Sequence, residues 1–274
     1  MANRVPQPQG DQCLQAYNRR FSRFSLQNNV HCVPVDQNEQ QRLEELDGIL
    51  REFHGRTVFP PFPPPGGDDE PCVLDCGCGQ GAWIDNFMDE FGPDVDVTGV
   101  DIFFGRGDDE DEDPDQSDSN GNGLEAVEEY RKKRWNLNAR FRDAPAEDRL
   151  RRESFDLINS RFLTEGINTD RWTSYIRELK ELLKPGGWLQ MAEVQLHFQS
   201  SNGRLRDDSN LARWWQWYSY TLPLMGKNPR IGRELGRLLG SAGFRNVRSH
   251  SYDLPIGGWN PGMVSFQWIC VVAF

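Results

Sequence analysis

No apolar run in this sequence is long enough to cross a membrane, since a transmembrane helix needs about 18 consecutive apolar residues. The opening stretch, MANRVPQPQGDQC, lacks the apolar centre of a secretion signal. Both absences argue against a membrane or secreted protein. We therefore expect a soluble, cytoplasmic chain whose cysteines stay mostly reduced.

Metal-ligand patterns are also missing. The sequence has six cysteines and four histidines, but no C-x-x-C pair and no histidine pair at ligand spacing. Cys76 and Cys78 alone would leave a zinc ion two ligands short. We therefore expect no metal site.

Acidic residues outnumber basic ones, 42 to 31, and this excess is local. The formal net charge is −11, but eight acids fall within residues 107–118, and without them the net charge is −3. No basic stripe marks a nucleic-acid surface, so we expect no nucleic-acid partner. We interpret the short run RKKR at 131–134 as the solvated face of a helix.

Composition predicts three parts along the chain, namely 1–58, 59–70 and 71–274. The first is an N-terminal extension with an irregular, strand-free start and an amphipathic helix over 37–56. We consider it a lid candidate because it precedes the core and has aromatic residues. The second, FPPFPPPGGDDE, is a linker, because its prolines can neither continue a helix nor pair as a strand.

The third part alternates apolar strands with amphipathic helices, which predicts βαβ units around a parallel sheet. The expected strands are 71–76, 96–103, 137–144, 154–163, 188–198, 246–256 and 263–274. The expected helices are 81–91, 123–134, 171–187, 210–226 and 231–244. The last two strands should form an antiparallel hairpin. The acidic segment 105–123 has too few apolar residues to order itself, so we interpret it as a disordered insertion.

The stretch VLDCGCGQGAWI places glycines between a strand and a helix, which is typical of a loop that cradles a nucleotide. Gly77, Gly79 and Ala82 satisfy the dinucleotide fingerprint loosely. Asp75, Gly77, Gly79 and Gly81 match the acidic pattern of S-adenosylmethionine sites in register. A carboxylate there would repel a pyrophosphate and would suit an ammonium and a sulfonium. Asp101, at the end of the next strand, can bind a ribose diol.

Together, VLDCGCGQGAWI, GVDIF, FRDAPAED, FDLINSRFL and LKPGGWLQMAE resemble the motifs of class I S-adenosylmethionine-dependent methyltransferases. More narrowly, the chain resembles the fungal group that contains secondary-metabolism tailoring enzymes and velvet-complex regulators. The resemblance implies a Rossmann-like, seven-stranded, mostly parallel sheet with an antiparallel last strand. It also implies helices on both faces of the sheet and an N-terminal helical extension.

The resemblance assigns ten residues to the cofactor. The residues at its methionine end are Asp75, Gly77, Gly79 and Gly81. The residues at its adenosine end are Asp101, Ile102, Asp143 and Ala144. The residues facing its methyl group are Asn159 and Ser160. Gly81 has a structural alternative in helix–strand packing, and Asp143 has one in capping a turn.

No catalytic base can be assigned from the motifs. The family often has a histidine after the fourth strand, where this chain has Asn159, which cannot act as a base. His197 and Glu193 remain as candidates. The aromatic helix over 210–226 either covers a flat ligand or packs in the core.

Three functions fit these observations. The first is methyl transfer to O, N or C of a small aromatic or polyketide- or indole-type metabolite. The second is regulation of secondary-metabolite genes, with a protein partner and a nuclear location. The third is a pseudo-enzyme that keeps the fold. The aromatic helix favours a small-molecule substrate.

Overall fold

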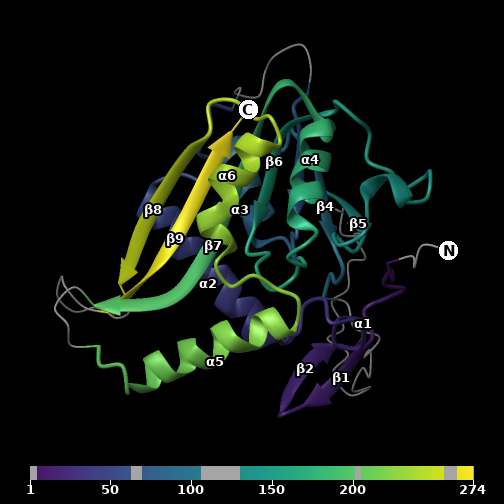
Figure 1. The fold of residues 1–274 in the computed structure, drawn as a ribbon. Coiled ribbons are helices and arrows are strands. Elements are labelled where there is room, and N and C mark those ends of the chain that lie inside the picture. The colour runs from purple at the N-terminus through teal and green to yellow at the C-terminus, as the bar shows by residue number, and fades with distance from the viewer. Residues whose placement is uncertain (1–4, 63–69, 106–129, 201–204, 256–263, 274) are drawn as a thin grey trace, which may run out of the picture.

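A computed structural model describes residues 5–62, 70–105, 130–200, 205–255 and 264–273. Its centre is a seven-stranded sheet (Figure 1). In spatial order the strands are β5 (Arg131–Arg134), β4 (Asp96–Asp101), β3 (Cys72–Cys76), β6 (Phe155–Arg161), β7 (Leu183–Ser200), β9 (Val264–Ala273) and β8 (Arg248–Pro255).

Strand directions agree with the expected α/β class. β5, β4, β3, β6 and β7 are parallel, so their carboxyl ends meet at one edge of the sheet. β9 is antiparallel to both β7 and β8, which confirms the predicted closing hairpin and the antiparallel last strand. The reversal of strand order beside β3 creates the crevice in which open α/β sheets bind ligands.

Helices cover both faces of the sheet (Figure 1). One face packs on α4 (Trp172–Leu182) and α6 (Leu235–Ser241), and the other packs on α3 (Ala82–Phe91). The alternation of strand side chains explains this division. Leu74 joins the cluster of α4 and α6, whereas Val73 joins the cluster of α3.

Two further long helices contact these layers. α2 (Gln37–His54) begins at Asp36, whose side chain accepts a hydrogen bond from the Glu39 amide, and it ends at Gly55 with φ 67°. This confirms the predicted amphipathic helix. α5 (Asn210–Leu224) contacts β7. Two short 3₁₀ helices, Phe141–Asp143 and Ile231–Glu234, complete these elements.

The predicted third strand, 137–144, is wrong. The strand that pairs with β4 is instead β5, the RKKR run that we expected on a helix, with Thr98 opposite Arg131 and Asp101 opposite Arg134. Charged side chains suit this position because an edge strand has one free side and is protected by charge. Residues 141–143 form a 3₁₀ helix.

The expectation of a strand-free N-terminus is also wrong. β1 (Cys13–Ala16) and β2 (Arg19–Ser22) form an antiparallel hairpin, followed by α1 (Arg23–Asn28). Tyr17 and Asn18 join the strands with φ of 52° and 59°, as a two-residue hairpin turn requires. Tyrosine rarely adopts this conformation, so the turn has no clear sequence signal.

Some predictions lie outside the described residues. They are the acidic insertion beyond residue 105, the first part of the predicted helix 123–134, and residues 63–69 of the proline-rich linker. Within the described part of the chain, no helix is both long and apolar enough to span a bilayer.

Candidate active site

A cavity of about 570 Å³ lies at the carboxyl ends of β3, β4 and β6, with residues 30–47 among those that line it. Seven predicted site residues line this cavity: Asp75, Gly77, Gly79, Asp101, Ile102, Asn159 and Glu193. The five predicted residues outside its lining are Gly81, Asp143, Ala144, Ser160 and His197.

The loop between β3 and α3 has the tight geometry expected of a cradle. Gly77 and Gly79 have φ of 78° and 55°, in the left-handed region that favours glycine. A Cβ on Gly77 would lie 2.4 Å from Leu163 Cδ2, so the position has no room for a side chain. The Gly77 amide donates to the Val100 carbonyl at 2.7 Å, which ties the loop to β4.

Gly81 has a packing role in this structure. It precedes α3 with φ 107°, and a Cβ there would lie 2.8 Å from the hydroxyl oxygen of Tyr130. This packing agrees with the structural alternative for Gly81, which lies outside the cavity lining. Cys78 is buried beside it, and burial raises the pKa of its thiol, which stays protonated at neutral pH.

Asp75, at the end of β3, is a buried carboxyl group held by amides. Asn159 Nδ2 donates to Asp75 Oδ1 at 2.8 Å, and Gln190 Nε2 donates to the side-chain oxygen Oδ1 of Asn159 at 3.1 Å. Burial raises the pKa of Asp75 to about 7, against the opposing charge of Arg161. A ligand with a positive charge would therefore stabilise the ionised form of Asp75.

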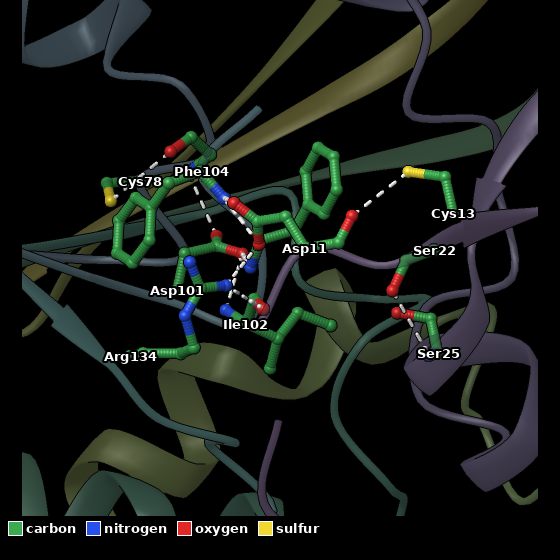
Figure 2. A network of polar contacts seen from close by, with 11 residues as sticks. Asp11, Cys13, Ser22, Ser25, Cys78, Asp101, Ile102, Phe104 and Arg134 are labelled. Atoms are coloured by element: carbon green, nitrogen blue, oxygen red, sulfur yellow. Dashed lines mark hydrogen bonds and ion pairs between the residues drawn. The ribbon is translucent and has the colours of Figure 1, made fainter. Parts of the chain in front are cut away.

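Asp101, at the end of β4, is held by three backbone amides (Figure 2). Its Oδ2 accepts from Gly79 at 2.8 Å, and its Oδ1 accepts from Ile102 at 2.6 Å and Phe103 at 3.0 Å. Burial raises the pKa of Asp101, while these amides stabilise the charged form. The carboxylate thus couples the glycine loop to the end of β4.

The N-terminal segment is anchored beside Asp101 (Figure 2). Buried Asp11 forms an ion pair with Arg134 and accepts a hydrogen bond from the Phe104 amide at 3.3 Å. Arg134 Nη1 also donates to the Ile102 carbonyl at 2.9 Å. One buried acid therefore fixes the segment before β1 to the end of β5 and to the loop after β4.

Asp143 and Ala144 do not reach the cavity. Asp143 is exposed in the 3₁₀ helix, and Ala144 is buried against the hydrophobic core. Because the edge strand ends at Arg134, the residues that follow it and line the cavity are 135–138. The misplaced third strand is thus the physical reason why these two residues lie outside the cavity lining.

Asn159 and Ser160 lie on opposite faces of β6, because neighbouring side chains of a strand alternate. Asn159 lines the cavity, whereas the Ser160 hydroxyl lies 3.0 Å from the Tyr175 hydroxyl on the α4 side. The prediction that Ser160 faces the cofactor methyl group is therefore corrected.

The two base candidates lie at different places along β7. Glu193 is fully buried and lines the cavity; it accepts hydrogen bonds from the amides of Leu163 at 2.8 Å and Thr164 at 3.0 Å. Burial raises its pKa to about 7. His197 instead packs on Trp215 with ring centroids 5.1 Å apart, and burial lowers its pKa. His197 thus lies outside the cavity.

The aromatic helix α5 contributes Tyr218 to the cavity. The Tyr218 hydroxyl donates to Glu165 Oε1 at 2.9 Å. Trp215 packs on β7, while Trp217 is 70% exposed. Tyr218 of this helix therefore lines the cavity, whereas Trp215 packs against β7.

Comparison with known proteins decides the family. Residues 40–249 match the model of a family described as a methyltransferase domain. The chain belongs to this methyltransferase family. Its cofactor is S-adenosylmethionine, and the site fits that cofactor. The glycine loop leaves no side chain in the way at Gly77, and Asp75 provides a buried carboxyl group for a cationic ligand.

The methyltransferase is similar to several fungal proteins. It is 26% identical to methyltransferase pytC of Aspergillus terreus, over 82% of this chain and 61% of that protein. It is 23% identical to N-methyltransferase sirN of Leptosphaeria maculans, over 86% and 73%. It is 22% identical to secondary metabolism regulator LAE1 of Cochliobolus heterostrophus, over 94% and 76%. The chain thus spans about three fifths of the length of pytC.

Solved structures include similar proteins. One is an S-adenosylmethionine-dependent methyltransferase from Archaeoglobus fulgidus, with a TM-score of 0.47 and 15% identity, over 84% of this chain and 93% of that chain. Another is human N-acetylserotonin methyltransferase, with a TM-score of 0.43 and 18% identity, over 87% and 56%.

Several cavity residues of the methyltransferase had no sequence signal. Arg161 ends β6 and forms an ion pair with Asp47 of α2, although the two are far apart in sequence. The residues that precede α2 also line the cavity. Only the chemistry of a charged residue at a strand end could have indicated Arg161, since parallel strands present their carboxyl ends to ligands.

Proposed function

We propose that this methyltransferase transfers a methyl group from S-adenosylmethionine to a small, largely apolar molecule of fungal secondary metabolism, in the cytoplasm. The observation that carries the proposal is the cavity itself. It joins the Asp75 and Asp101 carboxyl groups to a wall of apolar side chains. The apolar wall includes Val33, Pro34, Leu43, Val194, Leu196 and Phe198. A volume of about 570 Å³ is in the range of small-molecule sites.

In this proposal the cofactor lies along the carboxyl edge of the sheet. Asp75, Gly77 and Gly79 hold its methionine end, and Asp101 holds the ribose, with Ile102 beside the adenine. When bound, S-adenosylmethionine supplies an electrophilic methyl group on a sulfonium. The contribution of the protein is to hold the acceptor in line with that methyl group, which is worth about 7–11 kcal/mol in well-oriented reactions.

Glu193 is the proposed general base for an acceptor that must lose a proton. It is fully buried, it lines the cavity, and its pKa of about 7 suits proton transfer at neutral pH. Its hydrogen bonds from Leu163 and Thr164 also hold the turn after β6, so the residue has a positioning role as well.

The division of the chain supports a covering role for its N-terminal part. We propose that residues 1–58 close over the cavity, that 59–70 connect them, and that 71–274 form the methyltransferase domain. The support comes from residues 30–47, which line the cavity, and from Asp11, which is anchored to Arg134.

The first test is calorimetric titration of the purified chain with S-adenosylmethionine, with NADH as the control ligand. We expect binding of S-adenosylmethionine, no binding of NADH, and loss of binding in Asp75→Ala. A folded sample that does not bind S-adenosylmethionine would overturn the proposal. A positive result leads to transfer of a radiolabelled methyl group to candidate metabolites.

Regulation of secondary-metabolite genes is the second proposal, with a protein partner and a nuclear location. It is favoured by the similarity to regulator LAE1 over 94% of this chain. Deleting the gene separates the two proposals. Loss of methylation on one metabolite supports a tailoring enzyme, whereas loss of many unrelated metabolites supports a regulator.

A further inference from the structure

Arg161 is a half-buried cation of the cavity lining, and only some of its N–H groups have a hydrogen-bond partner in the described part of the chain. It ends β6, it lines the cavity, and its side chain is 12% exposed. Its Nε is buried and has no hydrogen-bond partner among the described residues. Buried donors are nearly always paired in folded proteins, so this one indicates an acceptor supplied by a ligand.

The position of Arg161 is held from two sides. Asp47 of α2 forms an ion pair with its Nη2 and accepts a hydrogen bond from Asn86 Nδ2 at 2.5 Å. The guanidinium carbon also lies 5.9 Å from the ring centroid of Trp83 and 5.4 Å from that of Phe162. The planar fork is therefore oriented before any ligand enters, and this lowers the entropic cost of binding.

The other arginine of the cavity lining does not offer the same group. Arg42 donates from Nε and Nη2 to the Glu39 carboxylate at 2.9 and 2.6 Å, and its side chain is 56% exposed. Its donors are satisfied within α2. Arg161 is thus the arginine of the described cavity lining with an unsatisfied, buried N–H.

Arg161 is a close neighbour of Asp75. Asp75 is the register partner of Asn159, and Arg161 lies two residues further along the same face of β6. The charge of Arg161 also acts on Asp75. The cavity therefore has a carboxyl group, Asp75, next to a guanidinium, Arg161. This pair can bind the ammonium and the carboxylate of an α-amino acid zwitterion.

We propose that Arg161, held by Asp47, binds the α-carboxylate of the methionine moiety, while Asp75 binds its ammonium. This inference rests on the proposed cofactor site and adds a carboxylate subsite to it. Asp47 acts as a positioning residue, so α2 contributes to cofactor affinity without touching the cofactor.

The test compares S-adenosylmethionine with its decarboxylated form, which keeps the ammonium and the sulfonium and lacks the carboxylate. Dissociation constants for both are measured by calorimetry on the wild type, Arg161→Lys, Asp47→Asn and Asp75→Asn. Arg237→Gln serves as a matched control, because Arg237 is exposed on α6, where it bonds to Glu234. Circular dichroism confirms that each variant is folded.

We expect the wild type to prefer the carboxylated ligand by about ten- to hundredfold, as a charge-assisted hydrogen bond predicts. Arg161→Lys and Asp47→Asn should reduce this preference and leave affinity for the decarboxylated ligand within about threefold. Asp75→Asn should weaken both ligands alike, and Arg237→Gln neither.

Three outcomes overturn the inference. Equal wild-type affinity for the two ligands would exclude a carboxylate subsite but leave the cofactor proposal intact. Equal weakening of both ligands in Arg161→Lys would make Arg161 a structural residue. An unchanged preference for the carboxylated ligand in folded Asp47→Asn would exclude a positioning role for Asp47. If Arg161→Lys does not fold, this unchanged preference in Asp47→Asn is sufficient to overturn the inference. Failure of the wild type to bind either ligand would instead overturn the proposed function.

Discussion

Asn159 of β6 donates a hydrogen bond of 2.8 Å to Asp75, its register partner on β3. The orientation of the Asn159 amide is set by Gln190, which donates to its carbonyl oxygen at 3.1 Å. Gln190 Oε1 in turn accepts from the Phe59 amide at 2.8 Å. This chain of hydrogen bonds connects the segment after α2 to Asp75, and it leaves lone pairs of the Asp75 carboxyl group for a ligand.

The affinity for S-adenosylmethionine should rise with pH. The pKa of Asp75 is raised to about 7, so its carboxyl is mostly protonated at pH 6 and must lose a proton to bind an ammonium. We expect a rise of up to about tenfold per pH unit below pH 7. Calorimetry from about pH 5.5 to 7.5 measures it. The slope should flatten in Asp75→Asn; the same slope in that variant would show that another group titrates.

The stability of the unliganded protein should fall as pH rises, opposite to the affinity for S-adenosylmethionine. The folded pKa values of Asp75 and Glu193 are about 7, above their ordinary values of 3.8 and 4.5, so folding favours their protonated forms. Their contribution is complete below the unfolded pKa values and is lost as pH rises to about 7. Urea unfolding at about pH 5 and pH 8 should therefore show a smaller loss in Asp75→Asn than in the wild type. Equal losses would contradict the raised pKa.

Gly77→Ala and Gly92→Ala both place an alanine at a positive φ, but in different surroundings. Their φ values are 78° and 82°, so each alanine should cost at least about 1–2 kcal/mol of unfolding free energy. The added Cβ meets Leu163 at 2.4 Å in one case and nothing within 4 Å in the other. We expect Gly77→Ala to destabilise further and to weaken S-adenosylmethionine binding at least about tenfold, with unchanged binding in Gly92→Ala. Equal affinities would mean that the loop adapts.

Asp11→Asn should speed cofactor release. It removes the buried charge that pairs with Arg134 and holds the N-terminal segment at the loop after β4. We expect the dissociation rate of S-adenosylmethionine, measured by stopped-flow tryptophan fluorescence, to rise about 5- to 50-fold.

The matched control for Asp11→Asn is Asp96→Asn. Its partner, Arg131, lies on the same strand as Arg134, but this pair is more exposed, at 63% and 27% for the two side chains. Exposed pairs contribute little, so the rate should stay near that of the wild type. A similar acceleration in both variants would exclude a specific anchoring role for Asp11.

Glu193→Gln should lower kcat by about 10²–10⁴-fold and remove an inflection near pH 7 from the pH–rate profile. Glutamine keeps one of the two acceptor oxygens, so it can hold Leu163 or Thr164 but not both. We therefore expect kcat to fall far more than KM for S-adenosylmethionine rises. His197→Gln is the control, because His197 packs on Trp215 outside the cavity. An unchanged pH profile in Glu193→Gln would restrict Glu193 to holding the turn.

Local patterns in the sequence were sufficient for the parallel sheet, the closing hairpin and the glycine cradle. The alternation of apolar strands with helices depends on neighbouring residues, and so do the positive φ values of Gly77 and Gly79. Asp75 and Asp101 could be placed because each directly follows the apolar core of its strand. Edge strands lack this signal, so β5 and the residues after it were misplaced.

Tertiary structure alone decided which side chains meet in the cavity. The pairing of Arg161 with Asp47 and of Arg134 with Asp11 joins segments more than a hundred residues apart. The faces of Ser160 and His197 depend on the register and twist of β6 and β7, and a shift of one residue reverses them. The sequence alone therefore determined the fold class and the chemistry of the glycine loop. Long-range packing determined the position of the N-terminal segment at the cavity, the ion pairs of Arg134 and Arg161, and the place of Glu193 in the cavity lining.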